Sequence, residues 1–166
     1  MHRWLPIGCL VLGLVLAGCA AAPTGESTPQ ERPVFVNLTN AADRSHTLEL
    51  WVAEDPLTGI RVHRSTGGDY TTRTSPAGLS TTAPGPHTIT SLTFPKRAAL
   101  YGRYTLAPGA TRTWTMAEPY PETVFVVVVY DGDRVTVWNS VTCDGVLYGF
   151  GVEATATGGP GAYHCL

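Results

Sequence analysis

The chain has 166 residues, with 13 acidic side chains against 11 basic ones and a formal net charge of −2. Charged residues make up only 14% of it and hydrophobic residues 43%, and 18 glycines and 13 prolines interrupt the sequence. This composition excludes a highly charged disordered chain, a coiled coil and a strongly basic nucleic-acid-binding protein. We therefore expect a single turn-rich domain with no nucleic-acid partner.

Residues 1–18 have the pattern of an export signal. Arg3 precedes an apolar run from Leu5 to Ala17, which is shorter than the roughly 20 residues that a membrane-spanning helix needs. The run ends in Leu-Ala-Gly-Cys, residues 16–19, which resembles the lipobox of prokaryotic lipoproteins. In a lipobox the signal is removed just before the cysteine, whose thiol receives a lipid. The alternative is an ordinary secretory signal that is cut near residues 20–22, so that Cys19 is lost.

The order and position of this motif favour the lipobox. We expect Cys19 to carry a lipid and to anchor the protein at the extracytoplasmic face of the cell membrane. Residues 19–33 continue with small and polar side chains and repeated prolines, which is typical of a flexible tether. The folded domain is then expected to cover residues 34–166.

Strand patterns begin at once in the predicted domain. Residues 34–39, 46–52 and 60–64 alternate or carry β-branched side chains, and turn residues separate them. A stretch rich in Thr, Ser, Gly and Pro predicts irregular structure over residues 65–86. Three more strands are expected over residues 87–94, 98–106 and 110–116.

The strongest strand is predicted at Thr123–Tyr130, where Phe125 precedes four consecutive valines. A continuous β-branched run between turn residues is typical of a strand that is covered on both faces. Asp131 and Gly132 predict a two-residue hairpin turn into a strand over residues 134–141, and a last strand covers residues 146–154. Seven to nine strands of this kind predict an all-β fold, an antiparallel immunoglobulin-like β-sandwich. A cupredoxin-like sandwich is the alternative.

The cysteine count also fits an exported domain. Cys9 lies inside the signal, and if Cys19 carries a lipid, Cys143 and Cys165 form an even pair. Export places this pair in an oxidising setting, where it is expected to form a disulfide. The closed loop of about 22 residues would stabilise the fold by about 3 kcal/mol. The alternative is two free, buried thiols.

Several segments together resemble uncharacterised surface lipoproteins of halophilic archaea. These are Asn37 with residues 45–47, residues 102–109, the run Val126–Tyr130 and residues 143–145. The resemblance spans most of residues 33–153. It implies a β-sandwich at the cell surface and no known activity.

A search for chemical motifs finds no catalytic set. No Gly-x-Ser-x-Gly motif occurs, and Cys143 is followed by Asp-Gly-Val without the histidine of a blue-copper loop. The spacing of His46, His63 and His87 matches no compact zinc motif. We therefore expect neither an enzyme nor a bound metal or cofactor.

Two other features bear on the surface of the domain. Asn37-Leu38-Thr39 fits the acceptor pattern for N-glycosylation. The tryptophans Trp51, Trp114 and Trp138 lie in alternating strands, where core packing is expected, although one on an outer face would make a binding platform.

The sequence thus predicts a lipid-anchored, extracytoplasmic surface protein that serves as a non-enzymatic binding or envelope-interaction module. Its partner would be a protein or a glycan, in addition to the membrane that the anchor enters. The alternative is a solute- or metal-binding accessory protein of a transporter.

The anchor can be tested by Cys19→Ser, with Cys9→Ser as the matched control inside the same signal. We expect Cys19→Ser to abolish incorporation of a labelled fatty acid and to leave uncut precursor or release the protein into the medium. Cys9→Ser should be lipidated normally, since that residue is removed with the signal. Unchanged membrane retention and labelling of Cys19→Ser would contradict lipidation.

Overall fold

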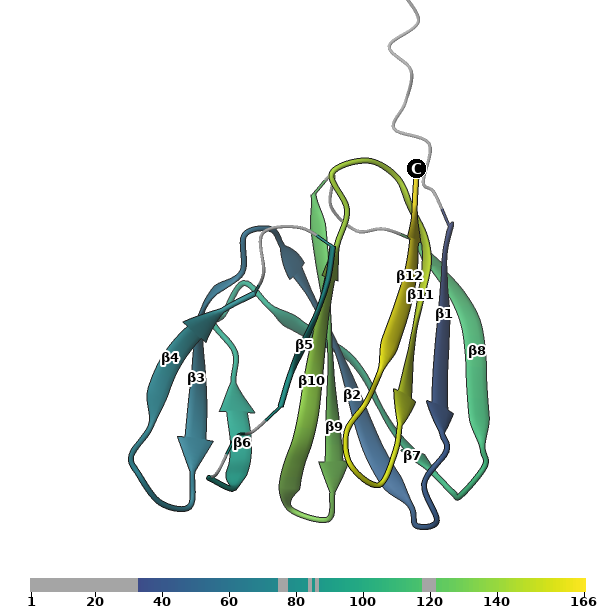
Figure 1. The fold of residues 1–166 in the computed structure, drawn as a ribbon. Coiled ribbons are helices and arrows are strands. Elements are labelled where there is room, and N and C mark those ends of the chain that lie inside the picture. Colours follow the sequence, from purple (N-terminus) through teal and green to yellow (C-terminus); the bar gives the residue numbers. More distant parts are fainter. Residues whose placement is uncertain (1–32, 75–77, 84, 86, 118–121) are drawn as a thin grey trace, which may run out of the picture. The chain divides into compact units, whose positions relative to one another are not determined.

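The described part of the chain consists of β-strands that form two facing sheets (Figure 1). This computed structural model describes residues 33–74, 78–83, 85, 87–117 and 122–166. The predicted signal, Cys19 and all of the predicted tether except Pro33 lie outside the described residues. None of the described residues forms a helix that is long and apolar enough to cross a membrane.

The smaller sheet joins the two ends of the domain. Its hydrogen-bonded order is β12 (Gly161–Cys165), β11 (Leu147–Ala154), β1 (Pro33–Asn40) and β8 (Thr111–Ala117). β1 and β11 run parallel to each other, whereas β11–β12 and β1–β8 are antiparallel. The first strand of the domain is therefore enclosed by strands from its C-terminal half.

The larger sheet has eight strands, with β9 near its centre. Its main order is β4 (Tyr70–Arg73), β3 (Thr58–Arg64), β6 (Ile89–Thr93), β10 (Arg134–Thr142), β9 (Thr123–Asp131), β2 (His46–Glu54) and β7 (Ala99–Leu106). Two strands share the edge of β10 that faces away from β9. β6 pairs with its beginning through Ile89 and Val135, and β5 (Gly78–Thr82) pairs with Trp138–Thr142.

The all-β sandwich expected from the sequence is confirmed. All nine predicted strands are present within a few residues of the expected bounds. The prediction of irregular structure over residues 65–86 is wrong in part, because β4 and β5 lie there. β12 is the third additional strand, which brings the described number to twelve. The assignment to an immunoglobulin-like rather than a cupredoxin-like sandwich stays a prediction.

The predicted hairpin between β9 and β10 is also present, with its turn one residue later than expected. Asp131 pairs with Arg134, so that Gly132 and Asp133 form the two-residue loop. Gly132 has a φ of +59°, which a glycine adopts without steric cost.

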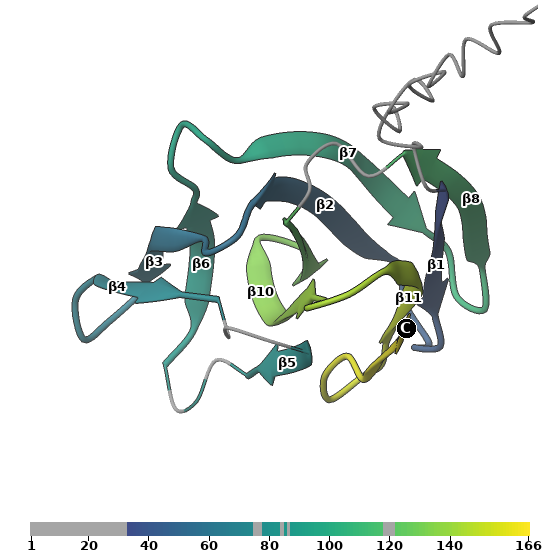
Figure 2. The same cartoon turned by 90° about the horizontal axis from the view of Figure 1, so that it is seen from above.

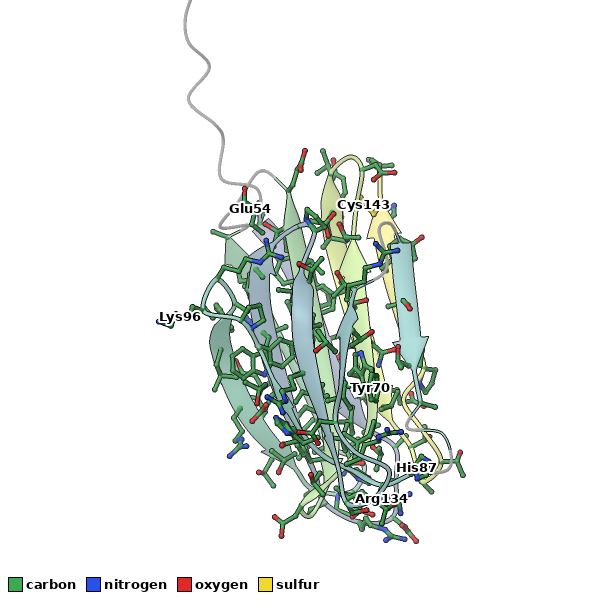
Figure 3. All side chains as sticks on the ribbon, turned by 90° about the vertical axis from the view of Figure 1, so that its left-hand side faces the viewer. Glu54, Tyr70, His87, Lys96, Arg134 and Cys143 are labelled. Atoms are coloured by element: carbon green, nitrogen blue, oxygen red, sulfur yellow. A yellow bond between two sulfur atoms is a disulfide. The ribbon has the colours of Figure 1, made fainter. Side chains whose placement is uncertain are left out.

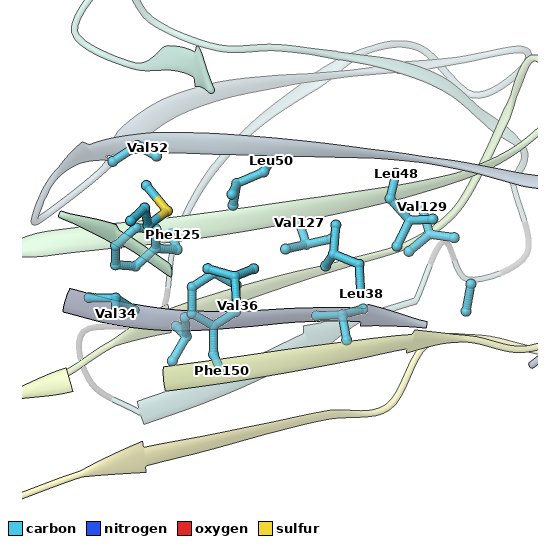
Figure 4. Close-up of a cluster of buried hydrophobic side chains, with 14 of the residues drawn as sticks. Val34, Val36, Leu38, Leu48, Leu50, Val52, Phe125, Val127, Val129 and Phe150 are labelled. Atoms are coloured by element: carbon cyan, nitrogen blue, oxygen red, sulfur yellow. The ribbon is translucent and has the colours of Figure 1, made fainter. Parts of the chain in front are cut away.

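β9 is buried along its length because two hydrophobic clusters cover its two faces. In the cluster between the sheets, Phe125, Val127 and Val129 face residues of β1 and β11 such as Val36 and Phe150 (Figure 4). In the other cluster, the opposite face of β9 meets apolar residues of β3, β6 and the start of β10: Ile60, Val62, Ile89, Leu92 and Val135. Seen from above, β3 and β6 lie on one side of β10, whereas β11 and β1 lie on its other side (Figure 2).

Because both faces of β9 are buried, polar substitutions on either face should destabilise the domain to a similar extent. Val126→Thr and Val127→Thr place a hydroxyl in different clusters, and each should lower the free energy of unfolding by about 1–3 kcal/mol. Thr113→Val, on the exposed face of β8, is the matched reverse change and should alter it by less than about 0.5 kcal/mol. Urea denaturation measures all three. A loss confined to one of the two valine variants would contradict a strand covered on both faces.

Candidate functional site

The predicted modification site and the predicted disulfide both involve the smaller sheet, whereas Cys19 lies outside the described residues. Asn37 lies on β1, Cys143 follows β10, and Cys165 ends β12. The glycines at 149 and 151 lie on β11 beside them. The smaller sheet therefore brings together segments that are more than 100 residues apart in the chain.

Cys143 and Cys165 are at disulfide distance, with sulfur atoms 2.15 Å apart and Cα atoms 6.0 Å apart. The pair links the end of β10, in the larger sheet, to the last strand of the smaller sheet. Both side chains pack against the core between the sheets. Beside them, Val146 and Leu166 exchange two backbone hydrogen bonds, of 2.9 and 3.0 Å. The C-terminus is thus fixed to the domain by covalent and backbone contacts.

The outer face of β11 lacks side chains where β1 approaches it most closely. Gly149 pairs with Phe35 and Gly151 with Asn37 in the parallel ladder. A Cβ atom at Gly149 would lie 2.7 Å from the backbone oxygen of Phe35, too close for any other residue without a backbone shift. The close approach of the two strands therefore requires glycine, and the missing side chains leave a hollow above β11.

Aromatic side chains form the rim of this hollow. Phe35 and Tyr148 are 49% and 47% exposed, and the Tyr148 ring lies 5.6 Å from the ring of His164. The hollow has a volume of about 380 Å³ and continues into a second one of about 260 Å³ that Thr39, Glu153 and Pro160 help to line. We call the two together the β11 trough. It follows the strands, with an aromatic end and a polar end.

Asn37 lies in the middle of the β11 trough and lines both hollows. Its Oδ1 atom is buried and has no hydrogen-bond partner among the described residues. N-glycosylation of Asn37 stays a prediction. Because Asn37 lines both hollows, a glycan on its side chain would compete with another molecule for the trough.

The three histidines weighed as metal ligands have separate environments. His46 is buried, and its Nδ1 lies 3.2 Å from the carbonyl oxygen of Arg44. His63 bridges Asp69 and Thr93, with 2.8 Å from each ring nitrogen to its partner. His87 lies near Gly67, at the end of the molecule opposite Cys143 (Figure 3). Among the described residues, no three His, Cys, Asp or Glu side chains come together as a metal site would require.

His63 and its neighbours hold the loop that follows β3. Desolvation acts to raise the pKa of Asp69, but the hydrogen bond and charge of His63 and the nearby Arg61 outweigh it and lower that pKa. Arg61 Nη2 lies 3.3 Å from the same carboxylate. These contacts tie β3 to the turn before β4.

The tryptophans do not provide the open binding platform. Trp138 is buried, and Trp51 is half-buried and stacks on Phe94 at 4.3 Å between ring centroids. Trp114 is half-buried between Tyr104, at 5.1 Å, and Tyr101, at 6.4 Å. The exposed rings at the β11 trough are instead Phe35, Tyr148 and Tyr163, none of which the sequence singled out.

A buried carboxylate in the larger sheet was not expected from the sequence. Glu49 is only 5% exposed and accepts hydrogen bonds from Trp51, Arg103 and Tyr130. Burial, followed by the charge of Glu49, raises the pKa of Tyr130 above its ordinary value. The alternation of β2 places Glu49 on the opposite face of the strand from Leu48 and Leu50, so the sequence predicts that the Glu49 side chain is exposed. The one available signal is the apolar run Trp51–Ala53, which shows that both faces of β2 are covered.

Comparisons with known proteins returned nothing: no family model, no curated protein and no solved structure matches this chain.

The Cys143–Cys165 pair predicts a measurable contribution to stability. Reduction, or the double variant Cys143→Ser with Cys165→Ser, should lower the free energy of unfolding by about 3 kcal/mol, because the unfolded chain regains the freedom of the closed loop. Thiol titration of the denatured protein before reduction should find neither cysteine free. Two reactive thiols in that titration would contradict the bridge.

Proposed function

We propose that this protein is a lipid-anchored, extracytoplasmic binding module without enzymatic activity, and that it binds a protein partner of the cell envelope at the β11 trough. The export signal and lipobox at Cys19 support the location, and so does the resemblance to haloarchaeal surface lipoproteins. The predicted tether has few apolar side chains to bury, which supports a role in which it holds the domain near the membrane while the domain binds its partner.

The observation that carries the binding site is the group of exposed aromatic rings at the trough, namely Phe35, Tyr148 and Tyr163. Phe35 and Tyr148 flank a backbone floor at Gly149, where a partner can approach without meeting side chains. Aromatic residues, Tyr in particular, are enriched at the centres of protein interfaces, because they bury large areas at a small cost in conformational entropy. Exposed apolar side chains that gather around a hollow mark an interaction surface.

The charge of the trough favours a protein partner with an apolar segment. Glu153 and His164 are the two titratable side chains besides tyrosine that line it, and they lie at its two ends. Its aromatic end is therefore nearly free of charge, and an apolar side chain of the partner would be desolvated there without displacing an ion pair.

A second candidate function is the solute-binding accessory protein of a transporter. A specific feature favours it, the polar cleft above Glu49 that is described below, in the larger sheet rather than at the trough. The two functions are compatible, because they use different strands.

The binding site can be tested by photo-cross-linking in intact cells. A photo-reactive phenylalanine derivative replaces Tyr148 in one variant and Tyr101 in the control, because these tyrosines are 47% and 48% exposed but Tyr101 lies on β7. We expect a protein adduct of one discrete mass at position 148, lost on Phe35→Ala, and none at position 101. No adduct at 148, or the same adducts at both positions, would overturn the site.

A further inference from the structure

A polar cleft opens in the larger sheet among residues of β2, β6, β7 and β9. Its volume is about 370 Å³. It is lined by hydroxyl-bearing residues of four strands and by one guanidinium: Thr47, Thr90, Ser91, Thr105, Tyr130 and Arg103. The turn at Gly132 and Asp133 closes one end. This turn leads into Arg134, which lies at the end of the molecule opposite Cys143 (Figure 3), so that the cleft is separate from the β11 trough.

The buried Glu49 carboxylate fixes two groups of this cleft. Its Oε1 atom accepts a hydrogen bond of 2.8 Å from Nε of Arg103, and Nη2 of the same guanidinium forms an ion pair with this oxygen. Its Oε2 atom accepts hydrogen bonds of 3.2 Å from the Tyr130 hydroxyl and 3.0 Å from Nε1 of Trp51. Both oxygens are therefore fully used inside the protein.

Arg103 is held in place while most of its side chain stays exposed. Its side chain is 63% exposed, and its guanidinium carbon lies 6.0 Å from the centre of the Tyr130 ring. The bonds to Glu49 and this aromatic contact fix a planar donor group that still has N–H groups left to offer. Since the conformational cost of ordering Arg103 is met in the free protein, a ligand that it binds does not meet that cost again.

Together, the other polar groups of the cleft offer both donors and acceptors, although Asp133 only accepts and the Thr90 hydroxyl already donates to the carbonyl oxygen of His63. Thr47 and Thr105 share one hydrogen bond of 3.0 Å between their hydroxyls, which leaves further capacity on each oxygen. The side chains of Ser91 and Asp133, which also line the cleft, have no hydrogen-bond partner among the described residues. A ligand with several hydroxyls would match this mixture of donors and acceptors.

The charges around the cleft favour a neutral ligand. Glu49 balances Arg103, and at the same end of the sandwich Arg44 lies 3.3 Å from Asp131. Asp133 then adds a negative charge to the lining. An anion would gain little from Arg103 and would be repelled by Asp133, whereas a diol can accept from the guanidinium and donate to the carboxylate.

We propose that this cleft is a binding site for a neutral saccharide or polyol, with Arg103 and the threonine hydroxyls as the groups that bind it and Glu49 as the residue that positions Arg103. The site does not depend on the β11 trough, so a negative result for one of the two proposed sites leaves the other unaffected.

The test is isothermal titration of the purified protein with four neutral probes, namely D-glucose, D-galactose, D-mannose and myo-inositol, and with inorganic phosphate as the anionic probe. We expect saturable binding of at least one neutral probe and none of phosphate. Arg103→Leu should weaken that binding at least tenfold. Arg112→Leu is the matched control, because Arg112 also lies over an aromatic ring, that of Tyr104, but does not line the cleft.

Arg103→Leu leaves the buried Glu49 without its cation and could unfold the domain, so a second pair of variants is needed. Thr105→Val removes one cleft hydroxyl and should weaken binding several-fold, whereas Thr113→Val on β8 should leave it unchanged. Saturable binding of phosphate alone, binding of no neutral probe by the folded protein, or unchanged affinity in Thr105→Val would each overturn the proposal.

Discussion

The burial of β9 on both faces is the constraint on which the rest of this structure depends. A strand from Thr123 to Asp131 with almost no exposed residue needs two separate apolar layers. The smaller sheet supplies one layer, through β1 and β11, and the curled part of the larger sheet supplies the other, through β3 and β6. The run of β-branched residues is stable only because both layers are present, since one exposed face would leave several valines in water.

The two candidate sites follow from how these layers are built. β1 and β11 approach each other closely to cover one face of β9, which requires Gly149 and leaves the trough on the outside of the smaller sheet. β6 helps to cover the other face of β9, and its Thr90 and Ser91 line the cleft together with residues of β2, β7 and β9. Glu49 is buried for the same reason. Its hydrogen bonds to Trp51, Arg103 and Tyr130 satisfy a carboxylate that would otherwise be costly to bury.

Local pattern was enough to predict nine of the twelve described strands and the cysteine pair. The alternation of residues 46–52 and the valine run of β9 are properties of neighbouring residues, and the pairing of Cys143 with Cys165 follows from the count of cysteines in a chain that is expected to be exported. Partners in space are not local properties. The parallel pairing of β1 with β11 and the cover over Glu49 both join segments far apart in the chain. β4 and β5 were missed because their Thr- and Gly-rich sequences become strands only by pairing with β3 and β10.

Native-state hydrogen exchange tests the central role of β9 most directly. If both faces of this strand are covered in every partly open form, the amides of Val124–Tyr130 that bond to β2 and β10 should exchange only through global unfolding. Their opening free energy should then equal the free energy of unfolding measured in denaturant. Exchange of these amides through a local opening of lower free energy, with the slowest amides in the smaller sheet instead, would contradict this account.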